Sequence, residues 1–333
     1  MKIYEKIKDF IKNYYKILLI YVSIFCIFTI HLPYYIEAPG GLIDTSERIK
    51  SNEEFKLKGS LNMAYVSQIH ATIPTYLFSV VNKDWQAEKE EDVTVGNEKM
   101  EDLEYRNKML LKESNKIAEL VAYQNSNIDY KIENEKIYIT YIDDQAKTDL
   151  KVKDQIIKID GNNVEDKKYL FNYIASKNIG DEVTFTTKNN NKEAIKKATL
   201  IDVEGEPKVG ALITEDFDIK SNKKIEFNFD KEESGPSGGM MLALTIYCNI
   251  NKIDLTNGKK IVGTGTIDID ETVGEISGVK YKLMGAVKNK ADVFLVPKGD
   301  NYEEAKKLKE ERGYKIDLVP VGTFEEVLKY LKS

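Results

Sequence analysis

The stretch SGPSGGMMLAL, residues 234–244, sets one serine among small residues directly before an apolar run. Glycines beside Ser237 would let a substrate main chain approach, while Pro236 stiffens the turn. The start of a helix offers free amide groups and a positive dipole end, which suit a developing oxyanion. Ser237 is therefore a candidate nucleophile. The simpler interpretation is that Ser234 or Ser237 only caps a core helix.

A serine nucleophile needs a base within hydrogen-bonding reach. The sequence contains only two histidines, and His31 lies at the end of a long apolar segment, so a Ser-His-Asp triad would have to use His70 alone. Lysine can replace histidine when burial lowers its pKa. Lys280 and Lys282 both lie in an amphipathic stretch, and Lys280 is at least as near the centre of its apolar face. The pattern alone leaves the choice between them open.

Two predicted elements would position these groups. The segment 238–250, GGMMLALTIYCNI, is apolar on every side until Asn249, which predicts a buried helix directly after Ser237. The segment 278–300 predicts a glycine-started helix followed by the apolar strand VFLVP. A buried serine-bearing helix and a lysine-bearing helix in one core could bring the two side chains together.

Composition excludes several other classes of protein. The formal net charge is −6 and the chain has few arginines, so we expect no nucleic-acid partner. Two cysteines, Cys26 and Cys248, indicate neither a disulfide framework nor a metal site. No G-x-x-x-x-G-K-[ST] loop occurs in the sequence. We therefore expect no cofactor, no metal and no ATPase within this polypeptide.

The N-terminal segment predicts a membrane anchor. Residues 17–36, ILLIYVSIFCIFTIHLPYYI, carry no formally charged side chain and are long enough to span a bilayer as a helix. Five lysines precede it against one glutamate and one aspartate, so the positive-inside rule keeps residues 1–16 in the cytoplasm. The alternative is a cleaved signal peptide, but YYIEAPGG does not match an A-x-A-like cleavage site.

The residues between the anchor and Ser237 predict a series of different elements along the chain. Residues 38–49, with Pro-Gly-Gly, indicate a turn, and 59–81 indicate one or two strands. Residues 97–125 lack Gly and Pro and predict a long amphipathic helix. From 129 to 203 short strands and one short helix alternate, and this part resembles a PDZ domain of the kind associated with bacterial proteases. Such a domain binds peptides by adding a strand to a sheet edge.

Four motifs carry a second resemblance: GPSGG at 235–239, GTGTID at 263–268, GVKYK at 278–282 and VFLVP at 293–297. Together they resemble the proteolytic domain of the Lon family, over residues 206–331. The order of anchor, PDZ-like domain and Lon-type domain is similar to that of the membrane-anchored Lon-like proteases of Gram-positive bacteria.

This resemblance implies the roles of individual residues. It implies that Ser237 is the nucleophile, that Lys282 rather than Lys280 is the base, and that Thr264 hydrogen-bonds the lysine. Backbone amides around Gly235, Pro236 and Ser237 are expected to form the oxyanion hole, with Gly238 a further supporting residue. Many Lon proteases have an acidic residue at the position of Ser234, and here Glu232 and Glu233 lie just upstream.

We therefore expect an α+β chain with five parts. These are a cytoplasmic tail (1–16), a transmembrane helix (17–36), a membrane-proximal region (37–128), a PDZ-like domain (129–203) and a Lon-type α/β proteolytic domain (206–333). The expected activity is ATP-independent endopeptidase cleavage of unfolded or flexible protein segments outside the cytoplasm by a Ser-Lys dyad. The alternatives are a non-catalytic membrane-anchored PDZ adaptor and a signal-peptidase-like enzyme, whose serine normally lies close to its anchor. A homo-oligomer is compatible with the expected activity and with these alternatives.

Overall fold

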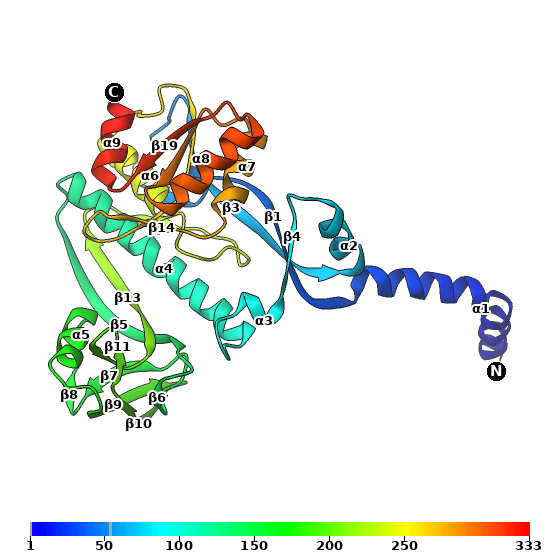
Figure 1. The fold of residues 1–333 in the computed structure, drawn as a ribbon, viewed down its shortest axis with the longest axis horizontal. Helices are drawn as coiled ribbons and strands as arrows, with labels where there is room; N and C mark the ends of the chain where they lie inside the picture. The colour runs from blue at the N-terminus through cyan, green and yellow to red at the C-terminus, as the bar shows by residue number, and fades with distance from the viewer. Residues whose placement is uncertain (1, 53–54) are drawn as a thin grey trace. The chain divides into compact units, whose positions relative to one another are not determined.

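The computed structural model describes residues 2–52 and 55–333 (Figure 1). The chain forms two compact units: one made of residues 1–40 and 66–93, the other of residues 41–65 and 94–333. Strands β1 (His31–Asp44) and β3 (Ser60–Thr72) contribute residues to both units.

The smaller unit contains the N-terminal helix α1 (Lys2–Thr29), which is long and apolar enough from Ile3 to Thr29 to cross a membrane. A signal sequence would share these features. It also contains helices α2 (Ile73–Val81) and α3 (Glu90–Val93) and strand β4 (Gln86–Lys89), which pairs with β1.

Three expectations for this part of the chain were wrong in whole or in part. The helix ends at Thr29 and residues 31–36 belong to β1, since Pro33 disfavours helical geometry at the residue before it. Strand β1 continues through Pro39–Gly41, so no turn occurs there. The stretch 59–81 is one strand, β3, followed by helix α2.

The larger unit is built on a sheet with the strand order β19-β18-β15-β3-β1, formed with β15 (Lys260–Gly263), β18 (Val293–Pro297) and β19 (Asp317–Val321). Strands β3, β15, β18 and β19 pair in parallel. Every residue of β18 is buried, as expected of a central parallel strand covered on both faces.

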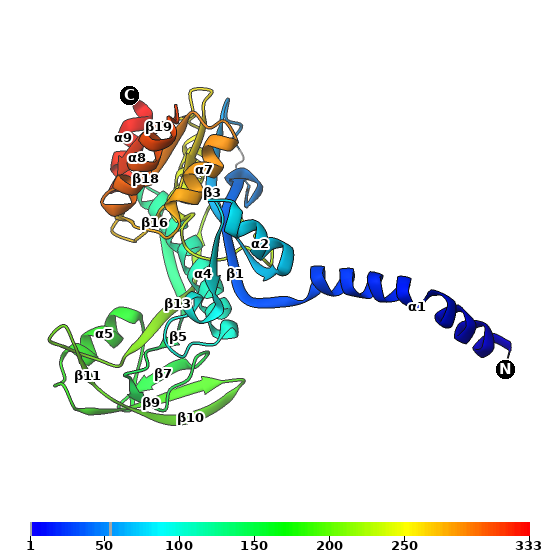
Figure 2. The ribbon, with the colours of Figure 1, turned by 45° about the vertical axis from the view of Figure 1, so that its right-hand side comes forward.

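Helices cover the two faces of this sheet (Figures 1 and 2). Helix α4 (Met100–Asn125), α6 (Gly239–Asn251) and α9 (Phe324–Lys332) pack with Val293 and Leu295 of β18 in one core. Helices α7 (Val279–Lys288) and α8 (Asp300–Arg312) pack with Phe294 and Val296 in the other. The alternation along β18 matches the two-residue period of a strand.

Short elements complete this part: the 3-10 turn η1 (Thr45–Glu47), β2 (Ile49–Ser51) paired with β14 (Ile225–Phe227), and β16 (Thr266–Ile267) paired with β17 (Val273–Gly274). The expected boundary between a membrane-proximal region at 37–128 and a proteolytic domain at 206–333 therefore does not divide the fold. Leu61 and Met63 of β3 and Val121 of α4 lie in the same core as α6.

A second sheet, with the order β13-β5-β7-β9-β10-β6, is inserted between α4 and β14. It consists of β5 (Tyr130–Ile142), β6 (Lys147–Thr148), β7 (Gln155–Ile159), β9 (Glu182–Asn189), β10 (Lys192–Thr199) and β13 (Ala211–Ser221). Strand β8 (Asn162–Asn163) pairs with β7, and β11 (Ile201–Val203) pairs with β12 (Glu206–Lys208). Helix α5 (Lys167–Ala175) supplies Leu170 and Ile174 to its core.

Candidate active site

Ser237 lies two residues before α6, whose N-cap is Gly238, and its side chain is partly exposed. The expected helix after the serine is confirmed. Gly235 has φ +87°, a backbone conformation that residues with a Cβ rarely adopt. A Cβ at Gly238 would come within 2.5 Å of the Met63 sulfur. The backbone conformation therefore favours glycine at 235, and a side chain at 238 would have to displace the Met63 side chain of β3.

The loop between β15 and β16 holds Ser237 from one side. The carbonyl oxygen of Ser237 accepts hydrogen bonds from the Gly265 amide at 2.8 Å and from Thr264 Oγ1 at 3.2 Å. The Met240 amide donates to the Gly265 carbonyl at 3.2 Å. These contacts fix the serine's backbone against the GTGT motif.

Helix α4 holds the same loop from another side. The Gly235 amide donates to the Asn107 carbonyl at 3.0 Å, and Ser114 Oγ donates to the Pro236 carbonyl at 3.0 Å. Sequence reasoning missed both contacts, because nothing in an amphipathic helix pattern marks which polar residue meets a distant loop.

These contacts narrow the choice of oxyanion donors. The Gly235 amide already donates to Asn107, and proline has no amide hydrogen. Of the three positions expected to supply donors, Gly235, Pro236 and Ser237, only the amide of Ser237 is left for an oxyanion.

Lys282 lies on α7, which starts after Gly278, and its side chain is only 4% exposed. Its Nζ donates to Thr264 Oγ1 at 3.2 Å, and Thr264 is fully buried. Lys280 is partly exposed, with Nζ 4.5 Å from the centroid of the Tyr281 ring. The structure thus joins Lys282 to Ser237 through one hydroxyl, because Thr264 contacts both residues.

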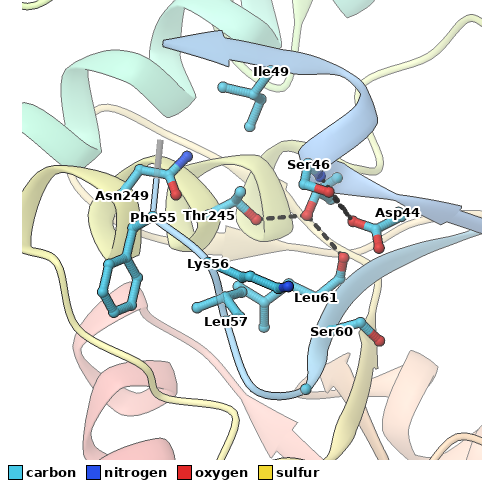
Figure 3. A pocket seen from close by; sticks show the side chains of 12 residues that line it. Asp44, Ser46, Ile49, Phe55, Lys56, Leu57, Ser60, Leu61, Thr245 and Asn249 are labelled. Atoms are coloured by element: carbon cyan, nitrogen blue, oxygen red, sulfur yellow. Dashed lines mark hydrogen bonds between the residues drawn. The ribbon is translucent and has the colours of Figure 1, made fainter. Parts of the chain in front are cut away.

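The cavity in Figure 3 is not part of this arrangement. It has a volume of about 520 Å³ and is lined by η1, β3 and two α6 residues, Thr245 and Asn249. Thr245 follows Ser237 by eight residues, roughly 12 Å along a helix. The buried Thr45 Oγ1 lies 2.6 Å from Thr245 Oγ1 and donates to the Leu61 carbonyl at 2.9 Å, so these polar groups are satisfied within the fold.

A second hollow, of about 580 Å³, runs between α4 and β14. Leu111 lines it and sits on α4 between Asn107 and Ser114, the two residues that hold the loop. The Asn115 Oδ1 atom is buried at this hollow and has no hydrogen-bond partner among the described residues.

Two segments of the chain match known protein families. Residues 116–199 match the PDZ domain family, and residues 228–332 match the Lon protease (S16) C-terminal proteolytic domain. The chain carries a PDZ domain and a Lon proteolytic domain. The Lon match includes Ser237, Thr264 and Lys282, whereas β3 and most of α4, which complete the same core, precede both matched segments.

Individual relatives agree with this assignment. The chain is 31% identical over 120 residues to Lon protease 2 of Borreliella burgdorferi, covering 34% of this chain and 14% of that protein. It is 29% identical over 98 residues to the Lon protease of Azospirillum brasilense, covering 29% of this chain and 12% of that protein. The chain therefore spans only a small part of the length of these curated relatives.

Part of the chain is also similar in sequence to solved structures. The PDZ domain of an SdrC-like protein from Listeria monocytogenes is 27% identical and covers 25% of this chain and 92% of that one, with a TM-score of 0.23. The PDZ domain of the SdrC-like protein from Listeria innocua is 29% identical and covers 23% and 92%, also with a TM-score of 0.23.

Proposed function

We propose that this protein is a membrane-anchored serine endopeptidase that uses Ser237 as nucleophile and Lys282 as general base. The observation that carries this proposal is the buried Lys282 amine, hydrogen-bonded to Thr264, whose hydroxyl also donates to the Ser237 carbonyl. The Lon proteolytic domain supports a serine-type peptidase, and we infer the dyad from the family resemblance together with these contacts.

The chemistry follows from burial. An amine removed from water favours its neutral form, and only a neutral amine can accept a proton. Lys282 would take the proton of Ser237 Oγ as that oxygen attacks a peptide carbonyl, and would then protonate the leaving amine. The Ser237 amide would stabilise the oxyanion. Water activated by the same lysine would then hydrolyse the acyl-enzyme.

Two further features shape the proposal. The sequence contains no P-loop, so we infer that the enzyme acts without ATP on segments that are already unfolded or flexible. Lysines precede the apolar part of α1, so we infer that the N-terminus is cytoplasmic and that both folded domains lie outside. The PDZ domain would then present extended peptide segments to the serine.

The test compares the full-length protein in detergent with three variants, using the unfolded protein casein as substrate. We expect Ser237→Ala and Lys282→Ala to lower the rate to below about one thousandth of the parent. Lys280→Ala is the matched control on the same helix and should keep most of the activity. A fluorophosphonate label should attach to the parent protein and not to Ser237→Ala.

Other outcomes would change the proposal. If Lys280→Ala is inactive and Lys282→Ala is active, the lysine assignment is wrong. If neither casein cleavage nor labelling occurs in any form, a non-catalytic adaptor that binds peptides through its PDZ domain replaces the protease.

A further inference from the structure

Helix α2 presents an apolar surface that nothing in the proposed catalytic function uses. Its sequence, IPTYLFSVV, contains no charged residue. Leu77, Phe78, Val80 and Val81 are exposed by 61%, 46%, 70% and 77%. Single exposed apolar residues are ordinary, but a contiguous group of this kind marks an interaction surface.

The position of α2 indicates what covers this surface. Helix α2 contacts α1 within the smaller compact unit, and Figure 2 shows it beside the end of α1 that leads into β1. The apolar side chains of α1 are themselves exposed along the helix. The α2 surface therefore continues the surface that a bilayer would cover.

Aromatic side chains gather around α2. The rings of Tyr34 and Tyr76 lie 4.9 Å apart, and Phe78 meets Trp85 edge-on at 4.7 Å. Tyrosine and tryptophan concentrate at the boundary between lipid tails and water, because their rings are apolar and their polar atoms remain hydrated.

We propose that α2 is an interfacial helix that inserts its exposed apolar side chains into the lipid surface next to the end of α1. The partner is the acyl-chain region of the bilayer. With nine residues α2 is too short to span a membrane, so it would lie along the surface. This inference rests on the proposed insertion of α1.

Trp85 is the only tryptophan in the chain, so it reports directly on this surface. The full-length protein would be reconstituted into phosphatidylcholine vesicles with and without brominated acyl chains. We expect bromine to quench Trp85 fluorescence by about half, since Trp85 contacts Phe78 at the lipid boundary. The double variant Leu77→Ser/Val81→Ser should lose most of this quenching.

The matched control is Ile195→Ser, which replaces a side chain that is 76% exposed on β10 in the other unit and should leave the quenching unchanged. Flotation of the vesicles after a carbonate wash tests α1 separately. Protein that fails to float shows that the anchor is wrong. If the protein floats but bromine does not quench Trp85 fluorescence, the α2 inference is overturned. If Trp85 is then also protected from quenching by acrylamide, the surface belongs to a protein partner instead.

Discussion

At the scale of single residues, Thr264 connects the two residues of the proposed dyad, Ser237 and Lys282. Its hydroxyl accepts from Lys282 Nζ and donates to the Ser237 carbonyl, each at 3.2 Å. The Gly265 amide also donates a hydrogen bond to the Ser237 carbonyl. Because Thr264 has no exposed surface, water cannot replace its hydroxyl if that group is removed.

We expect Thr264→Val to lower kcat by roughly tenfold to a hundredfold, because a hydrogen bond to an amine in a buried site contributes about 1.5–3 kcal/mol. Thr264→Ser keeps the hydroxyl and should retain most of the rate. Steady-state cleavage of a peptide substrate would measure both variants. Equal losses in the two would mean that the threonine methyl group, rather than its hydrogen bond, matters.

The serine could be proposed from its motif, whereas the lysine could be chosen only by family resemblance. A helical wheel counts apolar neighbours within one helix and gives Lys280 and Lys282 similar positions. What separates them is tertiary: Lys282 is buried against a threonine from a different strand–loop segment, and Lys280 extends over Tyr281. The Ser114 contact to Pro236 was equally hidden, because it joins residues 122 positions apart.

At the scale of elements, α4 is more than the solvated amphipathic helix that its sequence indicates. The helix covers residues 100–125 of the predicted 97–125, but its polar residues are partly buried. Glu119 is only 4% exposed and accepts a hydrogen bond from Tyr123 Oη at 2.9 Å. Tyr123 Oη also lies 3.1 Å from the Lys223 carbonyl oxygen, so this pair ties α4 to the chain before β14. Burial raises the pKa of Glu119 to about 7.

This pKa predicts a loss of stability with rising pH. Between pH 4.5 and 7 the folded state keeps the Glu119 proton that the unfolded state has released, so the free energy of unfolding falls as pH rises through this range. Glu119→Gln cannot ionise. We expect the free energy of unfolding of Glu119→Gln, taken relative to that of the parent, to be higher at pH 8 than at pH 4 by up to about 3 kcal/mol.

Calorimetric melting at the two pH values would measure this gain, with Glu104→Gln, an exposed position on the same helix, as control. A constant difference between parent and Glu119→Gln at both pH values would show that the pKa of Glu119 is the same in the folded and the unfolded state.

Helix α2 shows why an element type can be mistaken. Its β-branched and aromatic residues favour a strand. The helix start was nevertheless encoded, because Thr75 Oγ1 accepts from the Thr72 amide at 2.8 Å and Pro74 lies in the first turn. Local capping outweighed intrinsic propensity here.

At the scale of the whole chain, the larger unit is a proteolytic core interrupted by a PDZ domain. The motifs predicted both domains but not the interruption, because local pattern does not show that Ile49, Leu61 and Val121 pack with α6. Strand β3 joins the sheet by pairing with β15, two hundred residues later. Pairing over such a separation depends on the tertiary fold rather than on local pattern.

Helix α4 contacts the PDZ domain and the serine loop at adjacent positions. Glu113 Oε1 accepts from Lys167 Nζ of α5 at 3.1 Å and from the Glu215 amide of β13 at 3.0 Å. The next residue, Ser114, holds the Pro236 carbonyl. If the PDZ domain presents substrate to Ser237, this junction sets where the two domains meet.

We therefore expect Lys167→Ala to slow cleavage of casein by roughly threefold to tenfold, since a partly buried ion pair contributes about 1 kcal/mol. Labelling of Ser237 by a small fluorophosphonate should stay within about twofold of the parent, because the dyad itself is untouched. Lys168→Ala, at the exposed neighbouring position, is the control. Equal losses of cleavage and labelling would assign the Lys167–Glu113 contact to the stability of the catalytic core. Unchanged cleavage would mean that the PDZ domain does not deliver substrate through this junction.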